Sequence, residues 1–390
     1  MAEWKEYTVA DVISTVIDYR GKTPKKLGGD WSDSGYRALS AKNIKTGKIV
    51  QPDSIRYVAE DMYRCWMKDE VQKEDILITS EAPFGQIYYW DSDEKIVLSQ
   101  RLFAVRINQQ FYPKYIYFYM TSSFFQAELD GRATGTTVVG LRQPELLKCK
   151  IFAPDYQEQK RMADTLWCLE QKINNNEAIN NNLEQQAQAI YQQMFVDNPS
   201  PEWEEGTLSD IADITMGQSP SGSSYNEESN GTIFFQGRAE FGFRFPTVRL
   251  FTTEPKRMAC ANDTLMSVRA PVGDLNVAHT DCCIGRGLAA IHSKTNHQSF
   301  VLYTMFSLKK QLGVFNGEGT VFGSINRNSL NEMPILIPSD EKLDEFERIV
   351  APMDTAIRNN YDEICRLEQI RDSLLPKLMS GELDVSDIDL

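Results

Sequence analysis

Residues 151–154 read IFAP and residues 335–338 read ILIP, and the two segments occupy the same place in two copies of one 60-residue pattern. The copies, residues 135–194 and 319–378, align without a gap at a constant offset of 184. Long-range repetition of this kind constrains the fold before any local feature does. Because only two copies are present, we predict a duplicated domain-plus-helix unit with pseudo-twofold symmetry rather than a solenoid.

The similarity continues upstream with changes of spacing. EWKE at residues 3–6 matches EWEE at residues 202–205 at an offset of 199. APFG at residues 82–85 matches APVG at residues 270–273 at an offset of 188. The copies therefore differ by insertions in their globular parts, whereas their helical parts keep a constant spacing. We predict four segments: a globular domain over 1–155, a central helix over 156–197, a second globular domain over 198–338 and a C-terminal helix over 339–390.

Apolar positions in both predicted helices alternate at spacings of four and three residues. Sustained over four to five heptads, this spacing is typical of a coiled-coil seam. We expect the helices to pair with each other, antiparallel because of the pseudo-twofold symmetry; the alternative is that each packs only on its own domain. Two asparagines on the seam would lower stability but fix the register. The expected interface residues are Leu166, Ile173, Asn176, Leu183, Ile190, Val350, Ile357, Asn360, Leu367 and Leu374.

The composition is that of an ordinary globular protein, with 42% hydrophobic and 25% charged residues. No apolar run reaches the roughly 18 residues of a membrane span, and seven scattered cysteines are typical of a reduced, cytoplasmic protein. The net charge of −14 argues at first against a nucleic-acid partner. However, 21 basic and 21 acidic residues cancel over residues 1–155, whereas residues 339–390 carry −8. The charge therefore argues only against purely electrostatic DNA binding.

Signatures of catalysis are missing from the sequence. It has no GxxxxGK[ST] phosphate loop, no dinucleotide fingerprint, no HExxH and no GxSxG. Three histidines and two cysteines fall within nineteen residues: His279, Cys282, Cys283, His292 and His297. Their spacing is irregular, the first repeat has no equivalents, and residues 276–284 are predicted to form one strand. Zinc would require four ligands in paired spacings, so we predict no metal and no cofactor, with a metal-dependent enzyme as the least favoured alternative.

The duplicated layout, together with four phrases in the second half, resembles the specificity subunit of type I restriction-modification enzymes. The phrases are MGQSPSG at 216–222, SVRAPVGD at 267–274, RGLAA at 286–290 and GTVFGSI at 319–325. The resemblance covers nearly the whole chain. The first half departs from it at Glu81, which stands where the second half has Arg269.

The resemblance implies an α+β fold in which two mixed α/β target-recognition domains are joined by two long helices in an antiparallel coiled coil. Each domain would read one half of a split double-stranded DNA sequence. The helices would dock two methylation subunits, and the assembly would take on two restriction subunits where these exist. The chain itself would perform no chemistry, but would place a target adenine, which must leave the base stack, before the methylation subunit.

Side chains that read DNA make paired hydrogen bonds with base edges, typically Arg or Lys with guanine and Asn or Gln with adenine. Other polar side chains contact phosphates and only position the protein. The competing hypothesis is a protein-interaction scaffold, which the acidic net charge favours. The candidate DNA contacts are Lys22, Thr23, Lys25, Lys26, Arg37 and Lys42 in the first domain, and Gln218, Ser219, Ser221, Arg238, Arg244 and Arg269 in the second.

Overall fold

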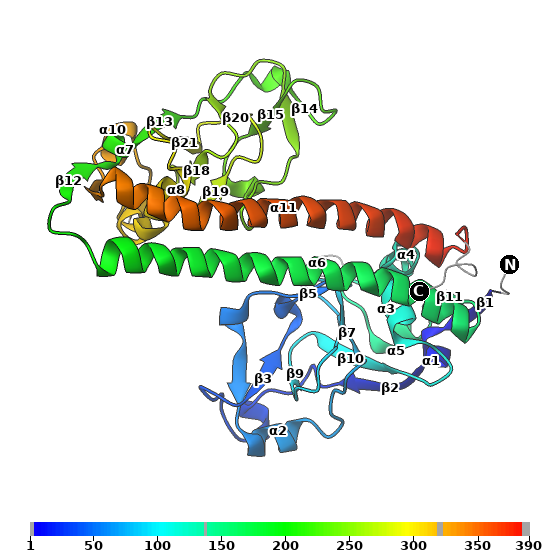
Figure 1. Ribbon diagram of the computed structural model, residues 1–390. Helices are drawn as coiled ribbons and strands as arrows, with labels where there is room; N and C mark the ends of the chain where they lie inside the picture. The colour runs from blue at the N-terminus through cyan, green and yellow to red at the C-terminus, as the bar shows by residue number, and fades with distance from the viewer. Residues whose placement is uncertain (1–3, 136–138, 318–322, 384–390) are drawn as a thin grey trace. The chain divides into compact units, whose positions relative to one another are not determined.

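The computed structural model describes residues 4–135, 139–317 and 323–383. The chain divides into two compact units. Unit 1 contains Met1–Asn175 and Glu363–Leu390, and unit 2 contains Asn176–Asp362. Each unit therefore combines one globular part with a portion of each long helix, α6 (green) and α11 (orange to red) in Figure 1.

An antiparallel four-stranded sheet forms the centre of the globular part of unit 1, in the order β2-β10-β7-β8. Side chains alternate between its two faces, as strand geometry requires. Ile76 and Ile78 enter a core shared with the helices, whereas Leu77 between them enters the core under a second sheet. The strands are β2 (Ile13–Asp18), β7 (Ile76–Thr79), β8 (Ile87–Tyr89) and β10 (Leu102–Ile107).

The second sheet of unit 1 has three strands, β6-β3-β9, and packs with α2 around the buried Trp66. The strands and helices that complete this unit are β1 (Lys5–Thr8), β3 (Tyr36–Leu39), β4 (Ile44–Lys45), β5 (Lys48–Ile49), β6 (Arg56–Val58), β9 (Val97–Leu98), β11 (Lys150–Ala153), α1 (Val9–Val12), α2 (Glu60–Trp66), α3 (Pro113–Thr121), α4 (Ser123–Arg132), α5 (Gln143–Leu147) and the 3-10 helices η1 (Lys25–Leu27), η2 (Ala41–Asn43) and η3 (Pro52–Ser54).

Unit 2 repeats this plan. Its four-stranded sheet has the order β13-β21-β18-β19, and a five-stranded sheet, β14-β16-β15-β20-β17, stands where unit 1 has three strands. Its elements are β12 (Glu204–Thr207), β13 (Ala212–Met216), β14 (Tyr225–Asn226), β15 (Thr232–Phe235), β16 (Leu250–Thr252), β17 (Met258–Ala259), β18 (Thr264–Ser267), β19 (Leu275–Val277), β20 (Cys282–Ile284), β21 (Leu288–Ser293), β22 (Pro334–Ile337), α7 (Leu208–Ile211), α8 (Gln298–Ser307), α9 (Lys309–Leu312), α10 (Arg327–Asn331), the 3-10 helices η5 (Gly222–Ser224), η6 (Arg238–Glu240) and η7 (Gly313–Asn316), and the π-helical turn η4 (Gln192–Asp197).

The duplication extends to hydrogen bonds. In unit 1 the carboxylate of Asp11 accepts a bond of 2.8 Å from the amide of Thr8, and in unit 2 Asp210 accepts one of 2.7 Å from Thr207. These bonds cap α1 and α7. The hydroxyl and the amide of Thr8 hold the pKa of Asp11 below its usual value, and the amide and the hydroxyl of Thr207 do the same for Asp210. Each cap follows an antiparallel pair of edge strands, β1 with β11 and β12 with β22.

The two long helices are α6 (Tyr156–Tyr191) and α11 (Asp340–Met379). Within unit 1, Lys172 of α6 pairs with Glu363 of α11 at 3.2 Å, and Glu170 pairs with Arg371 at 3.0 Å. The lower residue number on α6 pairs with the higher residue number on α11, so the helices are antiparallel there. Within unit 2 the rings of Tyr191 and Phe346 pack edge to face 5.9 Å apart. Asn180 of α6 contacts Ile357 of α11, so the helices are antiparallel in unit 2 as well.

The predicted seam lies in the interior of these helix pairs. Leu166, Ile173, Val350 and Ile357 are at most 1% exposed, and the other apolar seam residues are partly buried. Asn180, four residues after Asn176, makes polar contacts across the helix pair. Its side-chain amide donates to the carbonyl of Ile357 at 3.3 Å, and its side-chain oxygen accepts from the amide of Asn360 at 2.9 Å. The helices thus pack on each other as well as on the globular parts.

One predicted element was wrong. Residues 276–284 form two strands in different sheets, β19 and β20, because the chain turns at His279 and leaves the four-stranded sheet. The two Ala-Pro turns each follow a strand of the four-stranded sheet, β7 in unit 1 and β18 in unit 2. In the described residues, no helix has the length and apolar character that a membrane crossing requires.

Candidate nucleic-acid interface

Polar loops meet at one edge of the four-stranded sheet in unit 1. They follow β2 and β7, precede β10, and are joined by residues 139–142. Two backbone bonds hold them together: Ser80 donates to the carbonyl of Arg101 at 2.8 Å, and Leu141 donates to that of Ser80 at 2.9 Å. The loops surround an open cavity of about 860 Å³. We call this the first rim; its lining includes Asp18, Arg20, Thr23, Lys26, Glu81, Gln100, Arg101 and Arg142.

Unit 2 builds the corresponding edge, the second rim, with the same bonds. Val268 donates to the carbonyl of Gly287 at 2.9 Å, and Ile325 donates to that of Val268 at 3.1 Å. A further bond of 3.2 Å runs from the amide of Arg286 to the hydroxyl of Ser219 and ties the loop after β13 to the loop before β21. The second rim contains Gln218, Ser219, Arg238, Arg269, Asp274 and Arg286.

The matching bonds identify equivalent positions in the two rims. Ser80 corresponds to Val268 and Arg101 to Gly287, at the offsets of 188 and 186 that the sequence repeats show. Lys42 and Arg238 occupy similar places in the two units. Lys42 lies in η2, which follows β3, and Arg238 begins η6, which follows β15; β3 and β15 each have a parallel partner strand in the second sheet of their unit.

The predicted contacts of unit 1 fall into two groups. The side chains of Thr23 and Lys26 line the first rim, although the ammonium of Lys26 also donates to the carbonyl of Gly21 at 2.8 Å. Lys25 and Lys42 are exposed on η1 and η2. These four residues are available to a ligand on the surface of unit 1.

Lys22 and Arg37 are engaged in contacts within the protein. The ammonium of Lys22 donates to the carbonyl of Trp66 at 2.9 Å and lies 4.1 Å from the centre of the Tyr19 ring. The guanidinium of Arg37 donates from Nε to Glu94 at 2.6 Å, and this pairing raises the pKa of Arg37 further. Both side chains would have to exchange these partners to contact DNA.

Five of the six predicted contacts of unit 2 lie at or beside the second rim. Gln218 is exposed, Ser219 bonds to the Arg286 amide, and Ser221 shares a hydrogen bond of 2.8 Å with Ser223. The positions of the two arginines are also set by neighbouring segments. Arg238 pairs with Asp274 at 2.7 Å, and exposed Arg269 forms a backbone bridge with Ser324. Residues 319–322 of the predicted GTVFGSI motif lie outside the described residues.

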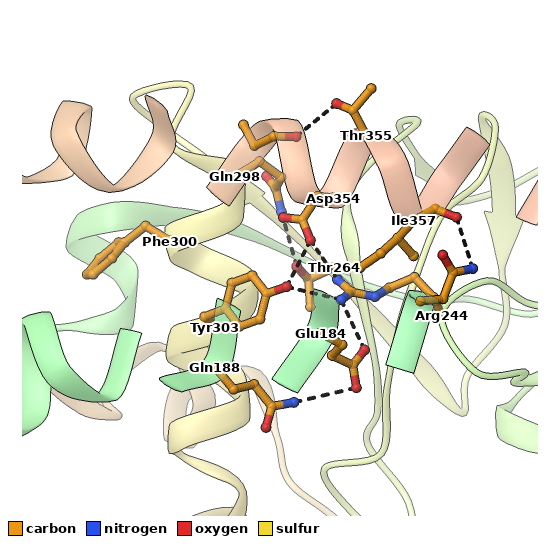
Figure 2. Close-up of polar contacts among 12 residues, drawn as sticks. Glu184, Gln188, Arg244, Thr264, Gln298, Phe300, Tyr303, Asp354, Thr355 and Ile357 are labelled. Carbon is orange, nitrogen blue, oxygen red and sulfur yellow. Dashed lines mark hydrogen bonds and ion pairs between the residues drawn. The ribbon is translucent and has the colours of Figure 1, made fainter. Parts of the chain in front are cut away.

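Arg244, the sixth, corrects the prediction. Its side chain is only 4% exposed, and it reaches from the globular part of unit 2 to both long helices (Figure 2). The guanidinium donates to Asp354 of α11 at 3.2 Å and to the hydroxyl of Tyr303 at 3.1 Å. It also lies 3.0 Å from Glu184 of α6, off the direction of a good hydrogen bond, so this contact is an ion pair only. No DNA base could reach this side chain, and we remove it from the candidates.

This buried cluster shifts the titration of its members. Burial raises the pKa of Glu184, and the charge of Arg244 counteracts that rise. Burial also raises the pKa of Tyr303, whose hydroxyl donates to Asp354 at 2.9 Å. The arrangement has the features of a structural junction that attaches the globular part of unit 2 to its helix pair.

The histidines also have structural contacts in unit 2. In each case a ring nitrogen shares a hydrogen bond with an aspartate carboxylate: His279 with Asp362 at 2.7 Å, His292 with Asp263 at 2.6 Å and His297 with Asp344 at 3.0 Å. Cys282 and Cys283 are buried in β20. The described residues contain no group of three or more metal-ligating side chains.

Four basic residues at the rims were not among the predicted contacts: Arg20, Arg101, Arg142 and Arg286. The guanidinium of Arg20 pairs with the carboxylate of Asp18, which accepts a hydrogen bond from its Nε at 2.8 Å. A signal for Arg101 and Arg286 was present, since Arg101 directly precedes β10 and Arg286 is the first residue of the RGLAA motif, two residues before β21. It was not sufficient, because only the tertiary structure places these loops beside those that follow β2 and β13.

Comparison with known proteins relates the whole chain to one family. The model of the type I restriction modification DNA specificity domain matches residues 1–185 and 201–369. A putative type I restriction enzyme MjaX specificity subunit of Methanocaldococcus jannaschii is 28% identical over 98% of this chain and 94% of its own length. The type I restriction enzyme HindI specificity subunit of Haemophilus influenzae is 21% identical over 98% of this chain and all of its own.

A solved structure shares the fold. The S subunit of a type I restriction-modification system from M. genitalium aligns with a TM-score of 0.65 over 97% of this chain and 96% of its own, at 17% identity. That likeness confirms the predicted α+β fold with two similar domains and long helices. Two copies of the family domain cover most of the sequence, one in each repeat, and the chain thus belongs to the family of type I restriction-modification DNA specificity subunits.

Proposed function

We propose that this specificity subunit reads a split DNA sequence, with the first rim contacting one half of the target and the second rim the other. Specificity subunits recognise DNA and are not catalytic, so the chemistry belongs to the methylation subunits with which the chain would assemble. The role of this chain is to hold a duplex so that the adenine to be methylated can leave the stack and enter the methylation subunit.

The observation that carries the proposal is the presence of two equivalent basic rims in an acidic chain. The first rim has four basic side chains, Arg20, Lys26, Arg101 and Arg142, against the two acids Asp18 and Glu81. The second has Arg238, Arg269 and Arg286 against Asp274. Each rim is thus net positive although the chain carries −14. Because DNA recognition needs local positive charge rather than a basic protein, this distribution favours a DNA ligand.

We assign different roles to the contacts within each rim. Lysines 25, 26 and 42 stand on exposed turns and suit phosphates, which position the protein without reading sequence. Gln218 and the exposed guanidinium of Arg269 suit base edges, because each can make two hydrogen bonds in one plane. The hydroxyls of Thr23, Ser219 and Ser221 are short and would contact either phosphates or bases from the loop backbone.

The long helices are the proposed docking surface for two methylation subunits, one per repeat, with two restriction subunits joining where the host has them. Several apolar side chains on the helices are exposed although their neighbours on the seam are buried: Ile179 is 49%, Ile349 42% and Ile370 46% exposed. Exposed apolar side chains beside a buried seam suit a protein partner. The seam residues themselves would act indirectly, by keeping the helices paired.

Two measurements test the proposal. The first is a map of methylated adenines in cells with and without this gene; loss at one split motif of two short halves is the expected result, and an unchanged map contradicts the proposal for an active system.

The second replaces residues 201–338 with the second recognition domain of another specificity subunit. We expect one half of the motif to change. A swap that changed both halves, or neither, would contradict the assignment of one reader to each half.

A further inference from the structure

The two rims differ in the positions that carry exposed arginines. Glu81 in unit 1 stands where unit 2 has Arg269, and Arg101 stands where unit 2 has Gly287. The backbone bonds at these positions are the same in both units, so the comparison is between equivalent sites on one scaffold. Each rim therefore has one arginine at this pair of positions, but on different loops.

A side chain at position 287 of unit 2 would be crowded. A Cβ atom on Gly287 would lie 3.0 Å from the carbonyl oxygen of Gln236 and 3.1 Å from the Cα of Gly237. Both neighbours are backbone atoms, which cannot move aside as the end of a side chain can. The second rim instead carries exposed arginines at the preceding position, Arg286, and on the loop after β18, Arg269.

Unit 1 places Arg101 in a backbone conformation that side chains seldom adopt and that Gly287 does not share. Arg101 has φ of +62°, in the left-handed region. Such conformations are disfavoured for residues other than glycine, and they concentrate at functional sites. The strained residue is also exposed, with 48% of its side chain accessible, so burial of an apolar group does not account for it.

Glu81 holds the Arg101 guanidinium by one edge. The distance from Nε of Arg101 to Oε1 of Glu81 is 3.0 Å. This contact is an ion pair, and within the described residues the guanidinium makes no hydrogen bond. Arg101 lines the cavity of the first rim, so its two terminal amino groups are available to a ligand. Paired terminal amino groups match the two acceptors, O6 and N7, on the major-groove edge of guanine.

We propose that Arg101 reads a guanine in the half of the target that unit 1 recognises, and that Glu81 is the positioning residue that orients its guanidinium. Arg101 is thus the functional counterpart of Arg269, carried by the loop before β10 instead of the loop after β18. This inference rests on the proposed function. It replaces Lys22 and Arg37, which are held by contacts within unit 1, as the base-reading residues of the first rim.

The test uses the full chain in complex with the methylation subunits of its host. Binding is measured by fluorescence anisotropy to a duplex carrying the methylated motif and to duplexes in which each base pair of the first half is changed. We expect Arg101→Ala to weaken target binding by about 10- to 100-fold and to abolish the preference at one G·C pair. Arg101→Lys, which keeps the charge but loses the fork, should regain non-specific affinity without regaining that preference.

Glu81→Gln separates positioning from a purely structural role. Removing its negative charge should strengthen binding to non-specific DNA, while the preference at the same G·C pair falls. A residue needed only for folding would weaken binding to all DNA. Arg269→Ala is the matched control and should alter preferences only in the second half.

Unchanged first-half preferences in Arg101→Ala would overturn the inference, as would an equal loss of affinity for target and non-target DNA, which indicates a phosphate contact. The failure of the proposed function would look different. In that case the wild-type complex would prefer no sequence, and Arg269→Ala would have no preference to change.

Discussion

Replacing Arg244 with methionine should destabilise unit 2 by about 3–4 kcal/mol without changing which DNA bases it prefers. The substitution approximately preserves volume but removes the cation between Glu184 and Asp354, whose side chains are 16% and 22% exposed. Breaking a buried ion pair by removing one partner costs about 3–5 kcal/mol, because the remaining charge is left uncompensated. We take the lower part of that range since both carboxylates retain some access to water, and Glu184 can take up a proton.

Thermal and urea unfolding of the full chain are the measurements. For a unit the size of residues 176–362, a loss of about 3 kcal/mol lowers the unfolding temperature by roughly 6–12 °C. Arg64→Met is the matched control, because Arg64 forms a surface pair with Glu60 on α2 and should contribute only about 0.3–0.5 kcal/mol.

A rescue variant distinguishes lost charge pairing from lost packing. Glu184→Gln and Asp354→Asn in the Arg244→Met background remove the uncompensated charges and should restore most of the lost stability. The reasoning is refuted if Arg244→Met costs less than about 1 kcal/mol, since the carboxylates would then be solvated without their partner. Altered base preference in the folded variant would instead return Arg244 to the DNA contacts.

Two further predictions concern buried polar groups of unit 2. Asn180→Leu should cost about 1–2 kcal/mol because the Asn360 amide loses its acceptor, whereas Leu at both positions should be close to wild type in urea unfolding; a double variant as unstable as the single one would contradict this. Burial raises the pKa of Glu347 above its usual 4.5, against the lowering effect of the Phe300 amide, which donates to it at 3.0 Å. The folded state therefore binds the proton more tightly, and the free energy of unfolding should fall as pH rises above about 4.5. Glu347→Gln should remove part of that fall, so its stability relative to wild type should be higher at about pH 8 than at pH 4.5; an equal difference at both values would contradict the assignment.

The sequence by itself determined the architecture, because the architecture follows from spacings that recur along the chain. A gapless repeat at an offset of 184 requires two equivalent units, and alternating four- and three-residue spacing requires paired helices. Both patterns depend on many residues, so single exceptions such as the turn at His279 do not disturb them. The seam residues Leu166 and Ile357 were found in this way, and both are fully buried.

Only the tertiary structure decided which arginines face solvent at the rims. Arg244 and Arg269 look alike in sequence, since both lie between apolar neighbours in stretches that contain glycine and proline. One is buried between a globular part and two helices, and the other is exposed. Arg101 could be recognised only because the structure places its loop at the cavity of the first rim. The physical reason is that a charged side chain takes its role from partners distant in sequence, such as Glu184 and Asp354 for Arg244, and no local pattern records them.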